Sequence, residues 1–152
     1  MNTLRVFVAG TPQPNPKLET TSGVTKAGKR YTRVFQRDKD GKKRAWMNSI
    51  AVAVNRVMKQ VKRECIGNDY WVELTVSVYV PRPDSVKRKD RIKPNVKPDA
   101  SNYYYAVENT MKELMYTDDS LVTDLHCTKR YAEDNDGKCG VLIEVEWGLN
   151  RE

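Results

Sequence analysis

Residues 71–80 read WVELTVSVYV, and their alternation predicts a β-strand with one buried face. The positions expected on the buried face are Val72, Leu74, Val76, Val78 and Val80. Glu73, Thr75 and Ser77 point to the opposite side. Because an apolar sheet face must be covered by another layer, this strand predicts a sheet with helices packed on it.

The segments on either side of this strand supply the other expected elements. Apolar residues recur every 3.6 positions over 44–64, and the stretch 101–115 shows a similar stripe, so both predict helices. Residues 3–9, 120–132 and 141–148 resemble strands, and the turn between the last two predicts a hairpin. The polar, basic segment 18–44 is expected to be a mobile loop. The order β-α-β-α-β-β predicts an α+β fold, with one mixed sheet and two main helices in a single domain over residues 1–152.

The charge is concentrated in two segments of a chain whose formal net charge is +7. Residues 26–44 hold nine Lys or Arg and two Asp, and residues 82–97 hold seven Lys or Arg and two Asp. Such concentrated positive charge favours a polyanionic partner, because each phosphate contact releases counterions. The alternative is that both segments are solvated loops whose charge only keeps the protein in solution.

The chain shows no feature of a membrane or secreted protein. It has no apolar run near 18 residues, and its N-terminus lacks the layout of a secretory signal. Its three cysteines have no CxxC spacing, which predicts reduced thiols in a cytoplasmic protein. Since His126 is the only histidine, a zinc site is not expected.

Acidic residues flank the second expected helix, within the stretch KPDASNYYYAVENTMKELMYTDDSLV (97–122). Asp99 precedes this helix, and the pair Asp118–Asp119 follows it where the next strand opens. A chain that returns to the sheet after a packed helix can bring these acids together. Mg²⁺ needs few protein carboxylates and activates water beside a phosphodiester, so the pattern predicts a magnesium site. For each acid alone the alternative is structural, with Asp99 as a helix cap and Asp118–Asp119 as a turn.

The runs KPDASN (97–102), YTDD (116–119) and KRY (129–131) give the chain a family likeness. With the opening GTPQPNPK (10–17), the sequence resembles the RusA family of Holliday junction resolvases, found largely in phages and prophages. The resemblance implies a homodimeric, Mg²⁺-dependent endonuclease that resolves four-way DNA junctions by paired nicks, with Mn²⁺ as a possible substitute. It implies no small-molecule cofactor and no membrane partner.

The resemblance also implies roles for single residues. Asp99 matches the first catalytic aspartate, and Asp119, with Asp118 beside it, matches the aspartate that follows the helix. The expected metal ligands are Asp99, Asp119 and the residue at position 101. The residues expected to contact DNA are Lys29, Arg30, Arg33, Lys87, Arg88, Lys89, Lys97 and Lys129.

Two positions depart from the family pattern. Ser101 stands where the family has its second aspartate, and Tyr105 stands where it has a helix lysine. Glu108 shares their helix face, but at about 1.5 Å per residue it lies about 10 Å from position 101, too far to replace the missing ligand there. Two functions follow, an active nuclease and a junction-binding protein that has lost cleavage. A basic RNA-binding domain is a third and more distant reading.

Overall fold

The computed structural model describes residues 2–15, 18–36 and 40–151 of the chain. The strands are β1 (Asn2–Ala9), β2 (Leu18–Val24), β3 (Arg30–Gln36), β4 (Tyr70–Val80), β5 (Val122–Tyr131) and β6 (Gly140–Leu149). The helices are α1 (Lys42–Gln60) and α2 (Ala100–Met111), with short 3₁₀ turns η1 (Asp119–Leu121) and η2 (Ala132–Asn135). Within these ranges, no helix is long and apolar enough to cross a membrane.

The main sheet confirms the predicted mixed architecture. Its strand order is β1-β6-β4-β5, with β4 and β5 parallel and the other neighbours antiparallel. The predicted hairpin of the last two strands is wrong, because β4 lies between β5 and β6. Strand β6 alternates buried and half-buried residues and takes an inner position, whereas the first half of β5 is mostly exposed and forms an edge.

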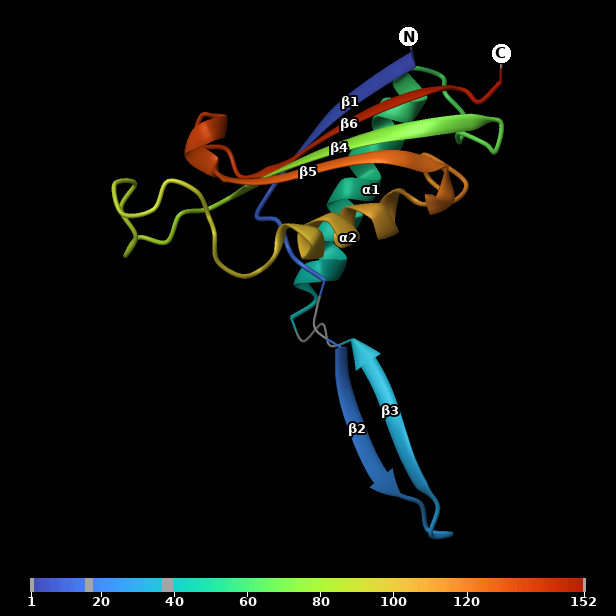
Figure 1. Ribbon diagram of the computed structural model, residues 1–152, viewed down its shortest axis with the longest axis vertical. Helices are drawn as coiled ribbons and strands as arrows, with labels where there is room; N and C mark the ends of the chain where they lie inside the picture. The colour runs from blue at the N-terminus through green and yellow to red at the C-terminus, as the bar shows by residue number, and fades with distance from the viewer. Residues whose placement is uncertain (1, 16–17, 37–39, 152) are drawn as a thin grey trace.

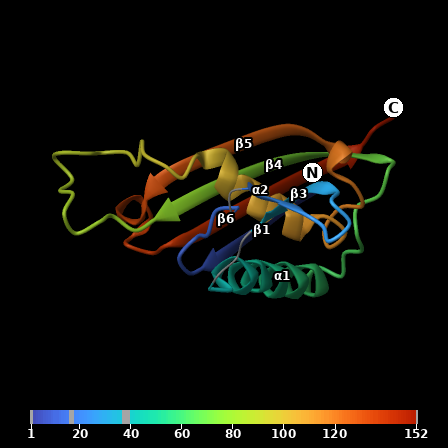
Figure 2. The same ribbon diagram turned by 90° about the horizontal axis from the view of Figure 1, so that it is seen from below.

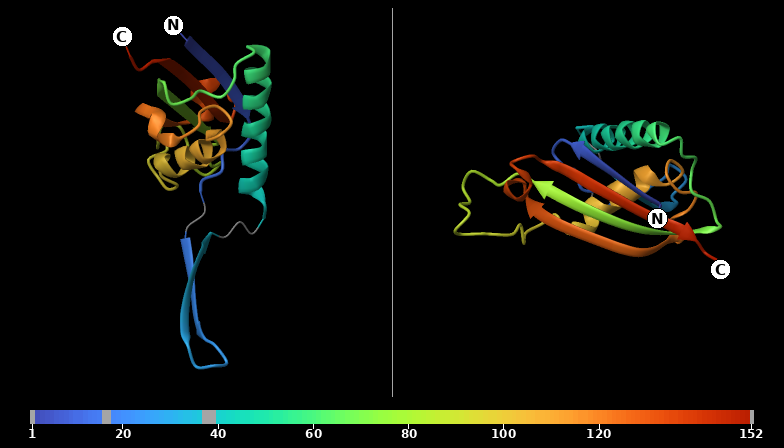
Figure 3. Two further views of the ribbon diagram at one scale, coloured as in Figure 1. Left: turned by 90° about the vertical axis from the view of Figure 1, so that its right-hand side faces the viewer. Right: turned by 90° about the horizontal axis from the view of Figure 1, so that it is seen from above.

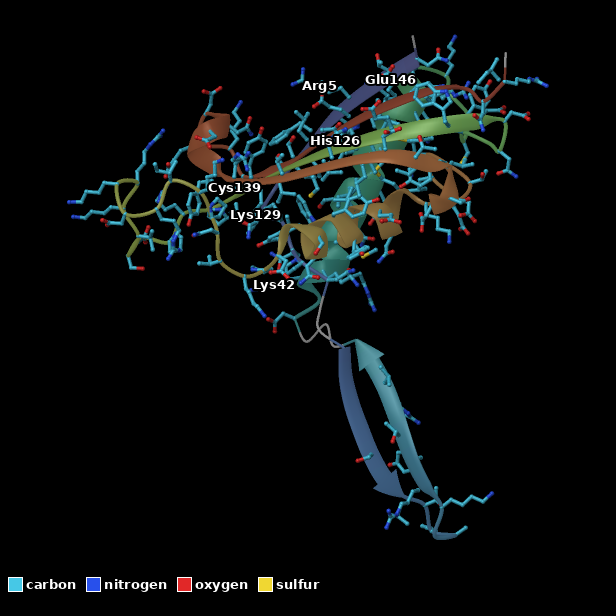
Figure 4. All side chains as sticks on the ribbon, in the orientation of Figure 1. Arg5, Lys42, His126, Lys129, Cys139 and Glu146 are labelled. Atoms are coloured by element: carbon cyan, nitrogen blue, oxygen red, sulfur yellow. The ribbon has the colours of Figure 1, made fainter. Side chains whose placement is uncertain are left out.

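The core lies between one face of this sheet and the two helices (Figures 1 and 3). The apolar set of β4 is buried as predicted. The same core contains Trp46, Ile50, Val54 and Met58 of α1, and Tyr104, Val107 and Met111 of α2. The other face carries polar side chains, among them Arg5, His126 and Glu146, which point away from the helices (Figure 4).

Residues 18–36 form a two-stranded hairpin, so the prediction of an irregular loop over 18–44 is wrong for this part. Strands β2 and β3 pair with each other in a separate sheet, which extends away from the rest of the molecule (Figure 1). The loop prediction also included residues 37–39, which lie outside the described residues, and the start of α1 at Lys42. The expected mobility of the segment stays a prediction.

The segment 81–99, called the proline-rich loop below, projects from the ends of β4 and β5 (Figure 2). Arg82 holds it in place. Its guanidinium donates to Glu133 and to the carbonyl of Arg91 at 2.6 Å, and it lies 4.0 Å from the centre of the Tyr131 ring. This loop leads directly into α2, so its anchoring fixes where α2 begins.

Candidate functional site

Asp99 is the N-cap residue of α2, as the Pro-Asp sequence before the helix predicts. Its extended backbone (φ −67°, ψ 151°) lets its carbonyl accept from Asn102 N at 3.0 Å. Within the described chain, its side chain makes no capping hydrogen bond. The residue is exposed. The carboxylate of Asp99 therefore does not cap the helix, and it is open to a ligand.

Lys129, on β5, positions the turn that carries Asp99. Its Nζ donates to the carbonyls of Val96 at 2.6 Å and Pro98 at 2.7 Å. Partial burial lowers the pKa of Lys129, and the negative charge of Asp99 partly opposes this shift. Figure 4 shows Lys129 on the side of β5 near the start of α2. Its predicted contact with DNA stays a prediction, but the hydrogen bonds give it a structural role that the sequence did not indicate.

A groove of about 600 Å³ surrounds Asp99 and is called the Asp99 groove below. The charged residues that line it are Asp99, Lys93, Lys97, Lys129 and Arg130. One carboxylate thus faces four cations in a space open to solvent. Lys93 and Arg130 were not among the predicted DNA contacts, although Arg130 follows Lys129 and Lys93 lines the same groove as Lys97. Their sequence signal was membership of the basic segment 82–97 and of the KRY run.

Asp118 has a structural role in a turn, as the structural alternative predicted. It caps the η1 turn, where its Oδ1 accepts from Ser120 N at 2.9 Å. This hydrogen bond lowers the pKa of the Asp118 carboxyl. Asp119 is the first residue of η1 and precedes β5, which begins at Val122, so it does not itself open the strand as the sequence suggested.

Asp119 lies beside Glu108 of α2, so the two form an acidic pair. Tyr104 and Tyr116 lie next to this pair. Burial raises the pKa of Glu108, and the neighbouring charge of Asp119 raises it further, whereas a hydrogen bond from the Tyr104 hydroxyl opposes the shift. Burial also raises the pKa of Tyr104 and of Tyr116, and the nearby carboxylates add to both shifts. These residues are called the Asp119 cluster below. Glu108 is a candidate site residue that the sequence reasoning set aside.

Two atoms of the Asp119 cluster are buried without a hydrogen-bond partner in the described part of the protein. They are Oδ1 of Asp119 and the hydroxyl oxygen of Tyr116. A buried polar atom that lacks a partner is costly, so each is a candidate ligand for a bound group. Residues 2–15, 18–36 and 40–151 contain no cluster of three or more acidic, Cys or His side chains arranged for a metal. Mg²⁺ is held by one or two carboxylates together with waters and phosphates, so the Glu108–Asp119 pair fits its requirements.

The two residues that depart from the family pattern both lie on the surface of α2. Ser101 is exposed in the first turn of the helix. Tyr105 is about half exposed, and its ring lies 5.7 Å from that of Tyr104 at a tilt of 53°. The expected place of Ser101 in a metal site stays a prediction. The contacts of the two aspartates differ, since Asp99 lies near Lys129 and Asp119 near Glu108.

The other predicted DNA contacts lie on two projections of the molecule. Lys29, Arg30 and Arg33 are on the β2–β3 hairpin, and all three are exposed. The exposed residues of the proline-rich loop are Lys87, Arg88, Lys89 and Lys97. The Arg88 guanidinium lies 3.8 Å from the Glu133 carboxylate. The fold therefore presents cations on two separate projections, which suits a surface for a long polyanion.

Comparison with known proteins gives two matches. The family model described as "Endodeoxyribonuclease RusA" matches residues 9–146, which include every element from β2 to η2 and most of β6. An uncharacterized protein of Bacillus subtilis (strain 168), YqaN, is 39% identical over 72 residues. That match covers 41% of this chain and 51% of the relative, so the chain spans about half the length of YqaN.

Proposed function

The chain belongs to the RusA endodeoxyribonuclease family, and on this premise we propose that it is a Mg²⁺-dependent endonuclease specific for four-way DNA junctions. It binds the junction as a homodimer and resolves it by paired nicks, one from each subunit, in DNA recombination and repair. Mn²⁺ is expected to substitute for Mg²⁺, since both favour oxygen ligands.

The observation that carries this proposal is the composition of the Asp99 groove. Four cations line it around a single acid. Lysine and arginine side chains hold phosphates by charge and hydrogen bonds. A carboxylate has no such role in a surface that only binds DNA, because it repels the backbone. Its presence among the cations is explained if it acts on a metal or a water at the phosphate held by its neighbours.

The Asp119 cluster is the second part of the proposed site. Asp119 and Glu108 would hold the metal through their carboxylates. Asp99, at the N-terminus of α2 and about 13 Å from Glu108 by helical rise, would face a different phosphate of the bound strand. When bound, the metal activates water and stabilises the charge on the leaving oxygen. Asp118 keeps the η1 turn in shape through its bond to Ser120 N, and so orients Asp119. Ser101 contributes a neutral hydroxyl oxygen near Asp99. This oxygen is expected to contact a metal through a water molecule.

A junction-binding protein without cleavage is the second candidate, and the exposed Ser101 and Tyr105 favour it. Serine removes one negative charge from the family's metal site. Tyrosine supplies no fixed positive charge at neutral pH. Neither change affects the basic residues of the groove, of the hairpin or of the proline-rich loop, so binding is retained in both candidates.

Cleavage of a synthetic four-way junction by the purified protein, in Mg²⁺ and in Mn²⁺, separates the two candidates. The nuclease predicts symmetric nicks that are lost in Asp119→Asn. The matched control is Asp124→Asn, an exposed aspartate on β5 that accepts from the hydroxyl of Thr123. This control should cut at the normal rate.

Ser101→Asp restores the family's second carboxylate and should cut faster than the natural sequence if the remaining site is competent. Retention of the junction in a gel shift without nicking in either metal, by both the natural protein and Ser101→Asp, would establish the binding protein instead. Equal affinity for linear duplex and four-way junction at the same salt concentration would argue against both candidates.

A further inference from the structure

A cavity of about 320 Å³ lies beside the Asp99 groove, and the proposed chemistry does not use it. It forms where residues 11–14, the proline-rich loop and the ends of β4 and β5 meet. Its walls are mainly apolar. Six prolines line it, namely Pro12, Pro14, Pro81, Pro83, Pro94 and Pro98. We call it the proline cavity.

The proline cavity and the Asp99 groove are adjacent and share part of their lining. Pro94, Val96, Lys97 and Lys129 line both of them. A DNA strand whose phosphates lie along the cations of the groove therefore runs next to the cavity, within reach of a group attached to that strand.

The walls of the proline cavity are held in place before any ligand binds. Proline fixes its own φ angle, so six prolines leave little conformational freedom to lose. The bonds from Lys129 Nζ to the carbonyls of Val96 and Pro98 fix one wall. Arg82 fixes another, through its bond to the Arg91 carbonyl and its contact with the Tyr131 ring. A preformed cavity binds at a lower entropic cost than one that must be ordered.

The chemistry of the walls selects the kind of ligand. The charged side chains among the lining residues are Lys97 and Lys129, and both are cations at the edge shared with the groove. A free phosphate would find few polar partners among prolines and valines. The volume is at the lower end of the roughly 300–1,000 Å³ typical of ligand cavities, so the occupant is a small group. A flat apolar group on an anionic backbone fits both the lining and the charge.

We propose that the proline cavity receives one unstacked nucleobase of the DNA strand that lies in the Asp99 groove. This inference rests on the proposed function and adds a reason for junction preference. Bases next to a branch point lose a stacking neighbour when the bound arms are not coaxially stacked, so extruding one costs less there than in a continuous duplex. The cavity thus favours branched DNA over linear DNA, and it places the phosphate next to the extruded base beside Asp99.

The test uses four-way junctions that carry 2-aminopurine at one position next to the branch point, with Ca²⁺ in place of Mg²⁺ to prevent cleavage. Fluorescence of 2-aminopurine rises when the base leaves the stack. We expect a rise on binding at one of these positions, and none for the same label inside a duplex arm. Junction affinity is measured separately by gel shift at fixed salt concentration.

Val96→Trp places an indole at the shared edge of the cavity and should abolish the rise and weaken junction binding about tenfold. Ile92→Trp is the matched control, because Ile92 is an exposed apolar residue of the same loop that does not line the cavity. Pro83→Trp narrows the cavity from another wall and replaces Val96→Trp if that variant does not fold, as judged by circular dichroism.

The outcomes separate the inference from the proposed function. A bound junction whose fluorescence does not rise at any branch-point position overturns the inference and leaves the proposed function in place. So does a rise that persists unchanged in folded Val96→Trp or Pro83→Trp. Failure of the natural protein to retain a four-way junction at all would overturn both.

Discussion

Replacing Glu108 with glutamine should change stability in opposite ways with and without a divalent cation. Glu108 lies beside Asp119, and burial together with the Asp119 charge raises the pKa of Glu108. Glutamine keeps the shape of the side chain and can still accept from the Tyr104 hydroxyl, but it removes one of two neighbouring negative charges. In the proposed function, a bound cation would offset this repulsion.

The size of the effect without metal can be estimated from Coulomb's law for two neighbouring charges. Two unit charges about 4 Å apart interact by about 4 kcal/mol at an effective dielectric constant of about 20. Partial exposure of both carboxyls and the positive charge of Lys112, which acts on Glu108, reduce this value. We expect Glu108→Gln to raise the free energy of unfolding by about 1 kcal/mol in EDTA, or roughly 2–4 °C in Tm for a chain of this size.

A divalent cation should cancel this gain. At a metal concentration of 100 Kd, binding stabilises the natural protein by about 2.7 kcal/mol. If the loss of the Glu108 charge weakens binding tenfold, the variant gains only about 1.4 kcal/mol at the same concentration. Its advantage of about 1 kcal/mol in EDTA then disappears in Mg²⁺ or Mn²⁺.

Urea unfolding in EDTA and in saturating Mn²⁺ measures both effects. Glu64→Gln is the control, because Glu64 is an exposed carboxylate outside the Asp119 cluster, and it should change neither measurement. The reasoning is refuted if Glu108→Gln is less stable than the natural protein in EDTA, or if its advantage is the same in both conditions. The second result would mean that the cation is held elsewhere.

Three further substitutions test the packing that positions the site. Tyr116→Phe removes a buried hydroxyl that has no hydrogen-bond partner in the described chain. It should raise the free energy of unfolding, measured by heat or urea, by about 1 kcal/mol. A loss of stability would show that the hydroxyl is hydrogen-bonded. Arg82→Ala should abolish the protection of the proline-rich loop amides against hydrogen exchange. Arg88→Ala removes a more exposed contact to the Glu133 carboxylate, which Arg82 also contacts, and should leave this protection intact. Gly140→Ala should lower the free energy of unfolding, measured in urea, by about 3 kcal/mol or more, because a Cβ there would lie 2.3 Å from the Val8 carbonyl oxygen. At Gly137 an added Cβ meets nothing within 4 Å. An equal loss of stability in Gly137→Ala would therefore contradict this explanation.

The sequence predicted those elements in which buried residues recur at a regular spacing. The alternation of residues 71–80 identified β4 and its buried face, and the 3.6-residue stripes identified both helices. The β2–β3 hairpin was missed because its strands pair only with each other and are largely exposed where the structure describes their side chains. Without a buried face there is no apolar alternation, and the high density of Lys and Arg suggested a loop instead.

The pairing of the last strands was wrong for a different reason. The turn after β5 is short, and a short turn favours a hairpin between consecutive strands. The four buried side chains of β6, Val141, Ile143, Val145 and Trp147, need neighbours on both sides, which β1 and β4 provide. Exposed residues such as Asp124 and His126 make β5 suited to an edge. The difference in polarity between the two strands was visible in the sequence and outweighs the turn.

The site shows why distance along a helix misled the sequence reasoning about Glu108. That reasoning asked whether Glu108 reaches position 101, and the helical rise of about 1.5 Å per residue correctly excludes it. The relevant neighbour is Asp119, which the chain brings back to the middle of α2 after the helix ends. A cation at Glu108 and Asp119 would then lie farther along α2 than one held by an aspartate at position 101. Ser101 and Glu108 together are consistent with a metal site displaced along the helix, whereas Ser101 alone would suggest a lost one.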